Sequence, residues 1–138
     1  MSVLITGSNT GFGKLAAISL ARTGKKVIAT MRDPNKGDDV RRVAKEEELP
    51  IEIRQLDVCD PDMVADCLSD ANEIEAIVNN AGFEVQSAVE QLEDELMWKQ
   101  LDTNLLGPLR LIRTVLPVWS QRGSGVIVNV SSIAGRSA

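Results

Sequence analysis

Five short runs of valine, isoleucine, leucine and alanine recur along this chain, and longer segments with apolar residues at helical spacing separate them. Nearly continuous apolar runs of this kind are typical of strands covered on both faces of a parallel sheet. The predicted strands span 2–6, 26–31, 51–56, 76–80 and 125–131. The predicted helices span 11–23, 38–48, 61–70 and 93–122. This alternation predicts an α/β fold with right-handed crossovers, and residues 1–138 form one domain at most.

Turn residues support two of these boundaries. Asp60 precedes Pro61, which is the order expected for a helix N-cap followed by proline at the first helical position. Gly24 follows the first predicted helix, where a left-handed residue would end it. Specific side chains, in addition to periodicity, therefore predict where these helices begin and end.

The glycine-rich segment 6–13 lies where the first predicted strand passes into the first predicted helix. Its glycines allow a tight turn with positive φ and let a pyrophosphate approach the backbone closely. Free N–H groups and the dipole at the helix start would then hold the negative charge. The predicted contacts are Gly7, Ser8, Asn9, Gly11, Phe12 and Gly13. The segment predicts a phosphate-binding loop, and a purely structural glycine turn is the alternative.

Charge and ionisable residues exclude several kinds of site. A net charge of −5 argues against nucleic acid and anionic membranes, which require a basic face. The chain has no histidine, and Cys59 and Cys67 lack the spacing of a metal-binding pair, so we expect no metal site. Neither a secretory leader nor an apolar stretch of ~18 residues is visible, and the thiols are typical of a reduced protein. We therefore expect a cytoplasmic protein without membrane or nucleic-acid partners.

Further motifs follow in order along the chain. They are TGxxxGxG at 6–13, Asp57-Val58 after the third predicted strand, NNAG at 79–82, Asn104 in the long predicted helix, and Ser131-Ser132 at the end of the last predicted strand. Together these motifs resemble those of the short-chain dehydrogenase/reductase family. The resemblance implies a Rossmann-type doubly wound parallel sheet in a three-layer α/β/α arrangement, with strand order 3-2-1-4-5. It also implies that the C-terminal strands of the family fold lie outside this chain.

The end of the second predicted strand bears on the choice of nucleotide. A carboxylate there accepts hydrogen bonds from the ribose of NAD and would repel a 2′-phosphate. By the resemblance, Met31 holds the position of that carboxylate and Arg32 follows it, and a guanidinium suits a phosphate. The resemblance thus implies NADP rather than NAD, with Arg32 as an ordinary solvated side chain the alternative. The resemblance also implies that Asp57 and Val58 flank the adenine. It implies that the nucleotide is lined beneath the ribose by Asn80, Ala81 and Gly82.

Two polar residues of the motifs concern catalysis. Pro108 lies four residues after Asn104 and has no N–H, so the carbonyl of Asn104 lacks the donor that an α-helix would give it. This carbonyl could serve a functional role, and a plain proline kink is the alternative interpretation. The resemblance implies that this carbonyl holds a water of a proton relay. It further implies that Ser132 hydrogen-bonds the reacting oxygen. Ser131 is the alternative, because successive strand residues face opposite ways.

The family's general acid/base is the tyrosine of a Tyr-x-x-x-Lys motif, and this chain contains no tyrosine. The resemblance therefore implies the N-terminal part of an NADP-dependent oxidoreductase that interconverts a carbonyl and an alcohol of a small molecule. We expect the chain alone to be inactive. The alternatives are a natural short form that binds the nucleotide without turnover, as a regulatory module, and a nonfunctional gene fragment.

Self-association is expected from the last predicted strand. Residues 125–130 contain no charge and no proline, and by the resemblance they form an edge of the sheet. Uncharged apolar edges pair readily with other chains. The long helix would add to the apolar surface through Leu109, Leu111, Ile112 and Leu116. We therefore expect the chain to self-associate through this edge or to be only marginally folded, and we expect a homo-oligomer.

Overall fold

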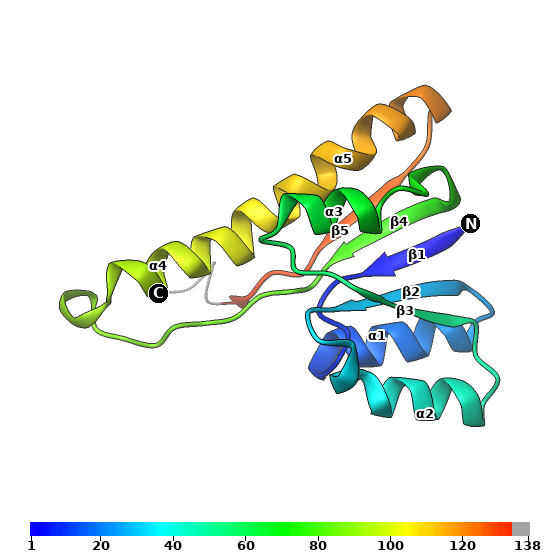
Figure 1. The fold of residues 1–138 in the computed structure, drawn as a ribbon, viewed down its shortest axis with the longest axis horizontal. Helices are drawn as coiled ribbons and strands as arrows, with labels where there is room; N and C mark the ends of the chain where they lie inside the picture. Colours follow the sequence, from blue (N-terminus) through cyan, green and yellow to red (C-terminus); the bar gives the residue numbers. More distant parts are fainter. Residues whose placement is uncertain (134–138) are drawn as a thin grey trace.

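The computed structural model describes residues 1–133, in which strands and helices alternate as the apolar runs predict (Figure 1). The strands are β1 (Ser2–Ile5), β2 (Lys26–Met31), β3 (Ile51–Gln55), β4 (Ile74–Asn79) and β5 (Val126–Asn129). The α-helices are α1 (Gly11–Arg22), α2 (Asp38–Glu46), α3 (Pro61–Cys67), α4 (Asp94–Leu101) and α5 (Gly107–Arg122). The short helical turns are η1 (Pro34–Gly37), η2 (Ala71–Glu73), η3 (Val89–Gln91) and η4 (Asp102–Leu106).

The five strands form one parallel sheet in the order β3-β2-β1-β4-β5. The central strand β1 pairs with both β2 and β4, so that Leu4 lies opposite Ile28 and Ile77. This order confirms the predicted Rossmann-type arrangement, in which the chain crosses to the other side of β1 after β3. Because all pairs are parallel, the carboxyl ends of the strands share one edge, where the loops that follow them meet.

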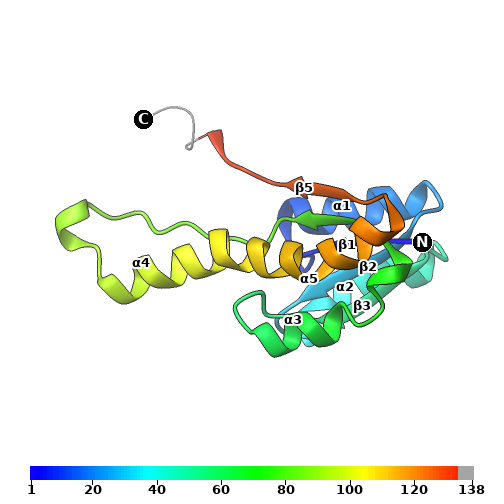
Figure 2. The ribbon, with the colours of Figure 1, turned by 90° about the horizontal axis from the view of Figure 1, so that it is seen from above.

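The long helix predicted over 93–122 is wrong in one respect, because it is divided by a π-helical turn. In η4 the N–H of Gly107 donates to the carbonyl of Asp102, five residues earlier, and Pro108 has no N–H with which to restore the regular α-helical pattern. Figure 2 shows α4 continuing the line of α5 and projecting beyond the sheet together with the segment that precedes it. The proline was visible in the sequence, but a kink and a π-helical turn are both compatible with it.

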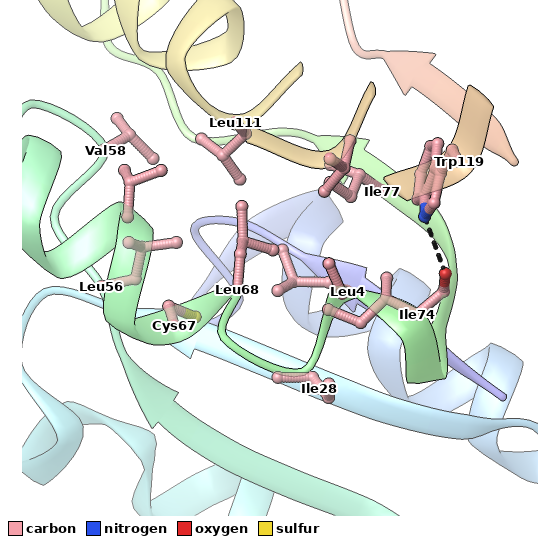
Figure 3. Close-up of a cluster of buried hydrophobic side chains, with 13 residues drawn as sticks. Leu4, Ile28, Leu56, Val58, Cys67, Leu68, Ile74, Ile77, Leu111 and Trp119 are labelled. Carbon is pink, nitrogen blue, oxygen red and sulfur yellow. Dashed lines mark hydrogen bonds between the residues drawn. The ribbon is translucent and has the colours of Figure 1, made fainter. Parts of the chain in front are cut away.

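Helices cover both faces of the sheet. Val3 and Ile5 of β1 pack with buried side chains of α1 and α2. Leu4, between them, belongs to the opposite cluster together with Leu111 of α5 (Figure 3) and Val64 of α3. Burying a leucine fully stabilises a fold by roughly 1.5–3 kcal/mol, and Leu4 is 0% exposed. The alternating side chains of one central strand thus hold both helical layers.

Trp119 packs at the amino ends of the strands, on the side of the sheet away from the carboxyl ends. Its indole N–H donates to the carbonyl of Ile74 at 3.0 Å (Figure 3), and Arg122 lies over the ring at 5.6 Å from its centroid. A side chain at Gly125 would overlap the indole, so the turn from α5 into β5 requires glycine. Trp98 in α4, by contrast, is 63% exposed.

The helix limits predicted from turn residues are confirmed. The carboxylate of Asp60 accepts hydrogen bonds from the N–H groups of Asp62 (2.9 Å) and Met63 (3.1 Å), and Pro61 is the first residue of α3. Gly24 has φ of +84° and donates its N–H to the carbonyl of Ala21 at 2.9 Å, directly after α1. Local side-chain chemistry therefore sets both ends.

Two expectations about exposure need correction. Leu111 is fully buried, because it shares the sheet-facing stripe of α5 with Val115 and Trp119 at intervals of four residues; Leu109 and Leu116 are exposed as predicted. The expectation that every strand is covered on both faces is wrong for β5. It is an edge of the sheet, and Val126, Val128 and Val130 are half-exposed.

Within residues 1–133, no helix combines the length and the apolarity needed to cross a bilayer. The same residues contain no group of three histidine, cysteine or carboxylate side chains placed to hold a metal ion. Cys59 and Cys67 are both free thiols.

Candidate functional site

The loops at the carboxyl edge of the sheet enclose a cavity of about 430 Å³. Its walls come from the β1–α1 loop, the end of β2, the segments after β3 and β4, and η4. The lining residues are Gly7, Asn9, Thr10, Phe12, Met31, Arg32, Leu56, Asp57, Val58, Asn80, Ala81, Gly82, Phe83 and Thr103. The cavity therefore brings together most of the predicted nucleotide contacts, at the edge where open α/β sheets bind ligands.

The β1–α1 loop lies directly against the segment after β4. Gly7 has φ of +67°, and a Cβ there would lie 2.9 Å from the Cα of Ala81. Glycine is thus required both for the backbone conformation and for the close approach. A Cβ at Gly13 would overlap the carbonyl oxygen of Gly7 and the side-chain nitrogen of Asn80. These two glycines let the loop and the β4 segment form one continuous wall.

Three predicted contacts of this loop lie outside the lining of the cavity. Ser8 is fully buried; its N–H donates to the carbonyl of Thr30 at 2.9 Å, and its hydroxyl donates to the carbonyl of Ile5 at 2.8 Å. Both polar groups of Ser8 therefore tie the loop to β1 and β2. Gly11 begins α1 with φ of +55°, and Gly13 faces the side chain of Asn80.

The first turn of α1 has features that favour binding of an anion. Thr10, its N-cap residue, makes no side-chain cap hydrogen bond within residues 1–133, and the turn has no acidic residue. In α3, by contrast, Asp60 caps two N–H groups and Asp62 lies in the first turn. The N–H groups and the dipole at a helix start favour negative charge. Because α1 borders the cavity through Thr10 and Phe12, a phosphate there would supply the oxygen that no side chain supplies.

Thr6 joins the β1–α1 loop to the segment after β4. Its hydroxyl oxygen accepts hydrogen bonds from the N–H groups of Asn80 (3.0 Å) and Ala81 (2.9 Å). The side-chain amide of Asn80 donates in turn to the carbonyls of Thr6 (2.9 Å) and Gly7 (3.2 Å). Sequence reasoning quoted Thr6 within its motif but missed this role, because the partners of the hydroxyl depend on the pairing of β1 with β4.

Arg32 reaches the cavity from the end of β2 with an exposed side chain. Its carbonyl accepts a hydrogen bond from the side chain of Gln55 at 3.0 Å, whereas its guanidinium has no hydrogen bond or ion pair with any residue of the described range 1–133. Met31 is buried, and the carboxylate of Asp33 accepts from the N–H of Asn35 at 3.0 Å. Arg32 lines the cavity and Asp33 does not, so the guanidinium is the charged group of this strand end that faces a ligand there.

Asp57 and Val58 form the wall after β3. The carboxylate of Asp57 accepts from the N–H of Cys59 at 2.9 Å, which fixes the turn. Val58 packs against Gly107, where a Cβ would overlap its side chain, and Arg110 donates to its carbonyl at 3.3 Å. The start of α5 therefore holds this wall in place.

Thr103 in η4 lines the cavity although no motif singled it out. Its hydroxyl oxygen lies 3.3 Å from the sulfur of Cys59. Burial raises the pKa of the Cys59 thiol, which therefore remains protonated near neutral pH. Periodicity could not have found Thr103, because the π-helical turn changes which side of the helix each residue occupies.

Asn104 lies beside the cavity rather than in its lining. Its side-chain amide donates to the carbonyl of Phe83 at 2.8 Å and accepts from the N–H of the same residue at 3.1 Å. A Cβ at Gly82 would lie 3.2 Å from the Asn104 side-chain oxygen. Ser131 and Ser132 are exposed beyond the end of β5 and do not line the cavity. Of the two predicted catalytic residues, Asn104 thus contacts the cavity wall, and Ser132 is not among the residues that line the cavity.

A family model described as short chain dehydrogenase matches residues 1–138. Human retinol dehydrogenase 8 is 40% identical over 139 residues, which cover 97% of this chain and 45% of that protein. The chain spans about half the length of the curated relatives it matches.

Solved structures share the fold. The bulky-bulky ketone specific alcohol dehydrogenase from Comamonas testosteroni is 28% identical with a TM-score of 0.88, covering 99% of this chain and 56% of that chain. A gluconate 5-dehydrogenase from Burkholderia cenocepacia, solved in complex with NADP and tartrate, is 26% identical with a TM-score of 0.89. It covers 99% of this chain and 55% of that chain.

Proposed function

This chain belongs to the short chain dehydrogenase family, and on that premise we propose that it binds NADP(H) in the cavity at the carboxyl edge of its sheet. Residues 1–138 would form the nucleotide-binding part of an oxidoreductase that interconverts a carbonyl and an alcohol of a small molecule. The bound nucleotide would supply or accept the hydride. The names of two relatives support this class of reaction, since one is a retinol dehydrogenase and the other a ketone-specific alcohol dehydrogenase.

The uncapped start of α1 supports binding of the pyrophosphate. Gly7, Asn9 and Phe12 line the adjoining wall of the cavity. We propose that the adenine lies beside Asp57 and Val58, which line the cavity after β3. The donor groups present in the cavity therefore fit a dinucleotide.

The guanidinium of Arg32 is the observation that supports NADP(H) rather than NAD(H) as the nucleotide. A 2′-phosphate requires a cation, whereas a free ribose hydroxyl pair requires a carboxylate at this strand end. Met31 supplies no charge, and Asp33 is not among the residues that line the cavity. The complex of the related gluconate 5-dehydrogenase with NADP is in keeping with this choice.

Titration of the folded chain with NADPH and NADH, before and after Arg32→Ala, tests the proposal. We expect Arg32→Ala to weaken NADPH binding by about 1.5–3 kcal/mol, the range for hydrogen bonds to charged groups, and to leave NADH binding nearly unchanged. Arg113→Ala, at an exposed arginine of α5, is the matched control. Equal affinity of the unsubstituted chain for the two nucleotides would refute the preference.

The catalytic roles remain part of the proposal. The carbonyl of Asn104 would hold a water for proton transfer, and Ser132, or its neighbour Ser131, would hydrogen-bond the reacting oxygen. We further propose that the protein functions in the cytoplasm as a homo-oligomer. The free thiols Cys59 and Cys67 fit a reducing compartment, and the half-exposed edge strand β5 fits self-association.

A further inference from the structure

The segment after β4 leaves the sheet and runs beside η4 and α4 (Figure 2). It contributes Ala81, Gly82 and Phe83 to the cavity, and it has no regular secondary structure as far as Ala88. An extended backbone outside a sheet must find other partners for its N–H groups. The residues that supply those partners therefore decide the course of this wall.

Side chains of one helix face supply them in register. The N–H of Phe83 donates to the side-chain oxygen of Asn104 at 3.1 Å, and the N–H of Val85 donates to the side-chain oxygen of Gln100 at 2.8 Å. Four helical residues rise by about 6 Å. Two extended residues advance by about 6.6 Å. Amide side chains one helical turn apart therefore reach alternate N–H groups of an extended segment.

Of these two hydrogen bonds, the one from Val85 to Gln100 lies farther from the cavity. One turn earlier the helix carries Leu96, which has no hydrogen-bonding side chain, and the segment from Gln86 to Gln91 is exposed. Val85 and Gln100 are each half-buried, so their hydrogen bond is partly shielded from water. Without Gln100, the side-chain hydrogen bonds between this segment and the helix within residues 1–133 would be those of Asn104 with Phe83, at the cavity.

We infer that Gln100 is a positioning residue for the nucleotide cavity. By accepting the hydrogen bond of Val85 it fixes the course of residues 82–85, and through them the wall formed by Gly82 and Phe83. Gln100 does not line the cavity and acts only through this backbone contact. The inference rests on the proposed binding of NADP(H).

Substitutions at Gln100 in the full chain test the inference, with NADPH binding followed by the fluorescence of the nucleotide. Gln100→Leu removes the acceptor at similar size, and we expect it to weaken binding by about fivefold, the factor that one net hydrogen bond supplies. Gln100→Glu keeps an acceptor oxygen at the same position and should bind like the unsubstituted chain. Gln121→Leu makes the same exchange at an exposed site of α5 and should have no effect.

Circular dichroism identifies any variant that fails to fold. Gln100→Asn, which withdraws the amide by one methylene, then takes the place of the leucine variant and should also weaken binding. If a folded leucine or asparagine variant binds NADPH as tightly as the unsubstituted chain, this inference is overturned, whereas the proposed function is not. Equal losses in the leucine and glutamate variants would overturn it too, because the acceptor would not matter. An unsubstituted chain that binds neither NADPH nor NADH would refute the proposed function, and this inference with it.

Discussion

Replacing Thr6 by valine tests whether one hydroxyl holds two loops of the cavity together. Thr6 is 1% exposed, and its oxygen accepts hydrogen bonds from the N–H groups of Asn80 and Ala81 at 3.0 and 2.9 Å. Valine has nearly the same volume, so the change removes the acceptor without leaving a void. Both N–H groups would then have no side-chain acceptor.

The expected loss of stability follows from these two donors. A buried donor left without a partner costs about 1–3 kcal/mol. Asn80 and Ala81 are half-buried, so we take the lower part of that range for each. The free energy of unfolding should fall by about 2–3 kcal/mol in total. For a chain of this length, such a loss lowers the midpoint of thermal unfolding by about 7–10 °C.

Thr30→Val is the matched control. Thr30 is equally buried, and its hydroxyl donates to the carbonyl of Ile5 at 3.2 Å. The hydroxyl of Ser8 donates to the same carbonyl at 2.8 Å, so Thr30→Val leaves no group without a partner. Urea unfolding with equal m values should show the larger loss for Thr6→Val, and Thr6→Ser should retain most of the stability. Equal losses for the two valine variants would refute the reasoning that the orphaned N–H groups cause the effect.

Three other properties of the chain can be measured directly. The chain alone should not reduce aldehydes or ketones with NADPH, because it contains no tyrosine to act as the general acid; turnover that Ser132→Ala abolishes would contradict this. The guanidinium of Arg54 donates to both carboxylate oxygens of Asp70 at 2.8 and 2.7 Å and lowers the pKa of Asp70 below its ordinary 3.8. The stabilising contribution of this pair is therefore present above that pH and is lost as the pH falls through the lowered pKa. Urea unfolding of Asp70→Asn should therefore show a smaller loss of stability in acid than the unsubstituted chain, and an equal loss would contradict the role of the pair. The chain should self-associate through β5, and Val128→Lys should reduce this in light scattering at several concentrations; a concentration-independent monomer would count against it.

Elements set by local chemistry were predictable from the sequence. The cap at Asp60 and the left-handed Gly24 lie where their side chains, or the lack of one, favour a helix end. The apolar runs predicted all five strands because a strand of a parallel sheet needs apolar side chains wherever helices cover it, and the edge strand β5 is apolar although it is only partly covered. The strand order came from the family resemblance, since the residues alone do not state which strands pair.

Features that depend on contacts between distant segments were not predictable. Leu111 and Leu109 look alike in the sequence, and only the docking of α5 on the sheet decides which one is buried. The π-helical turn η4 likewise places Thr103 at the cavity. Gln100 acquires a partner only because the segment after β4 runs beside its helix. For the candidate site, the motifs predicted the lining well and the residues that hold it poorly.

The contrasting surroundings of the two tryptophans have a spectroscopic consequence. The chain contains no tyrosine, so its two indoles dominate its ultraviolet emission. Trp119, with its N–H bonded to Ile74 and its ring beneath Arg122, should emit at short wavelength and resist quenching by iodide until the sheet unfolds. Trp98, largely exposed on α4, should emit at long wavelength and be quenched in the folded chain. The short-wavelength, quencher-resistant part of the emission would therefore report unfolding of the sheet, without a contribution from the projecting helix.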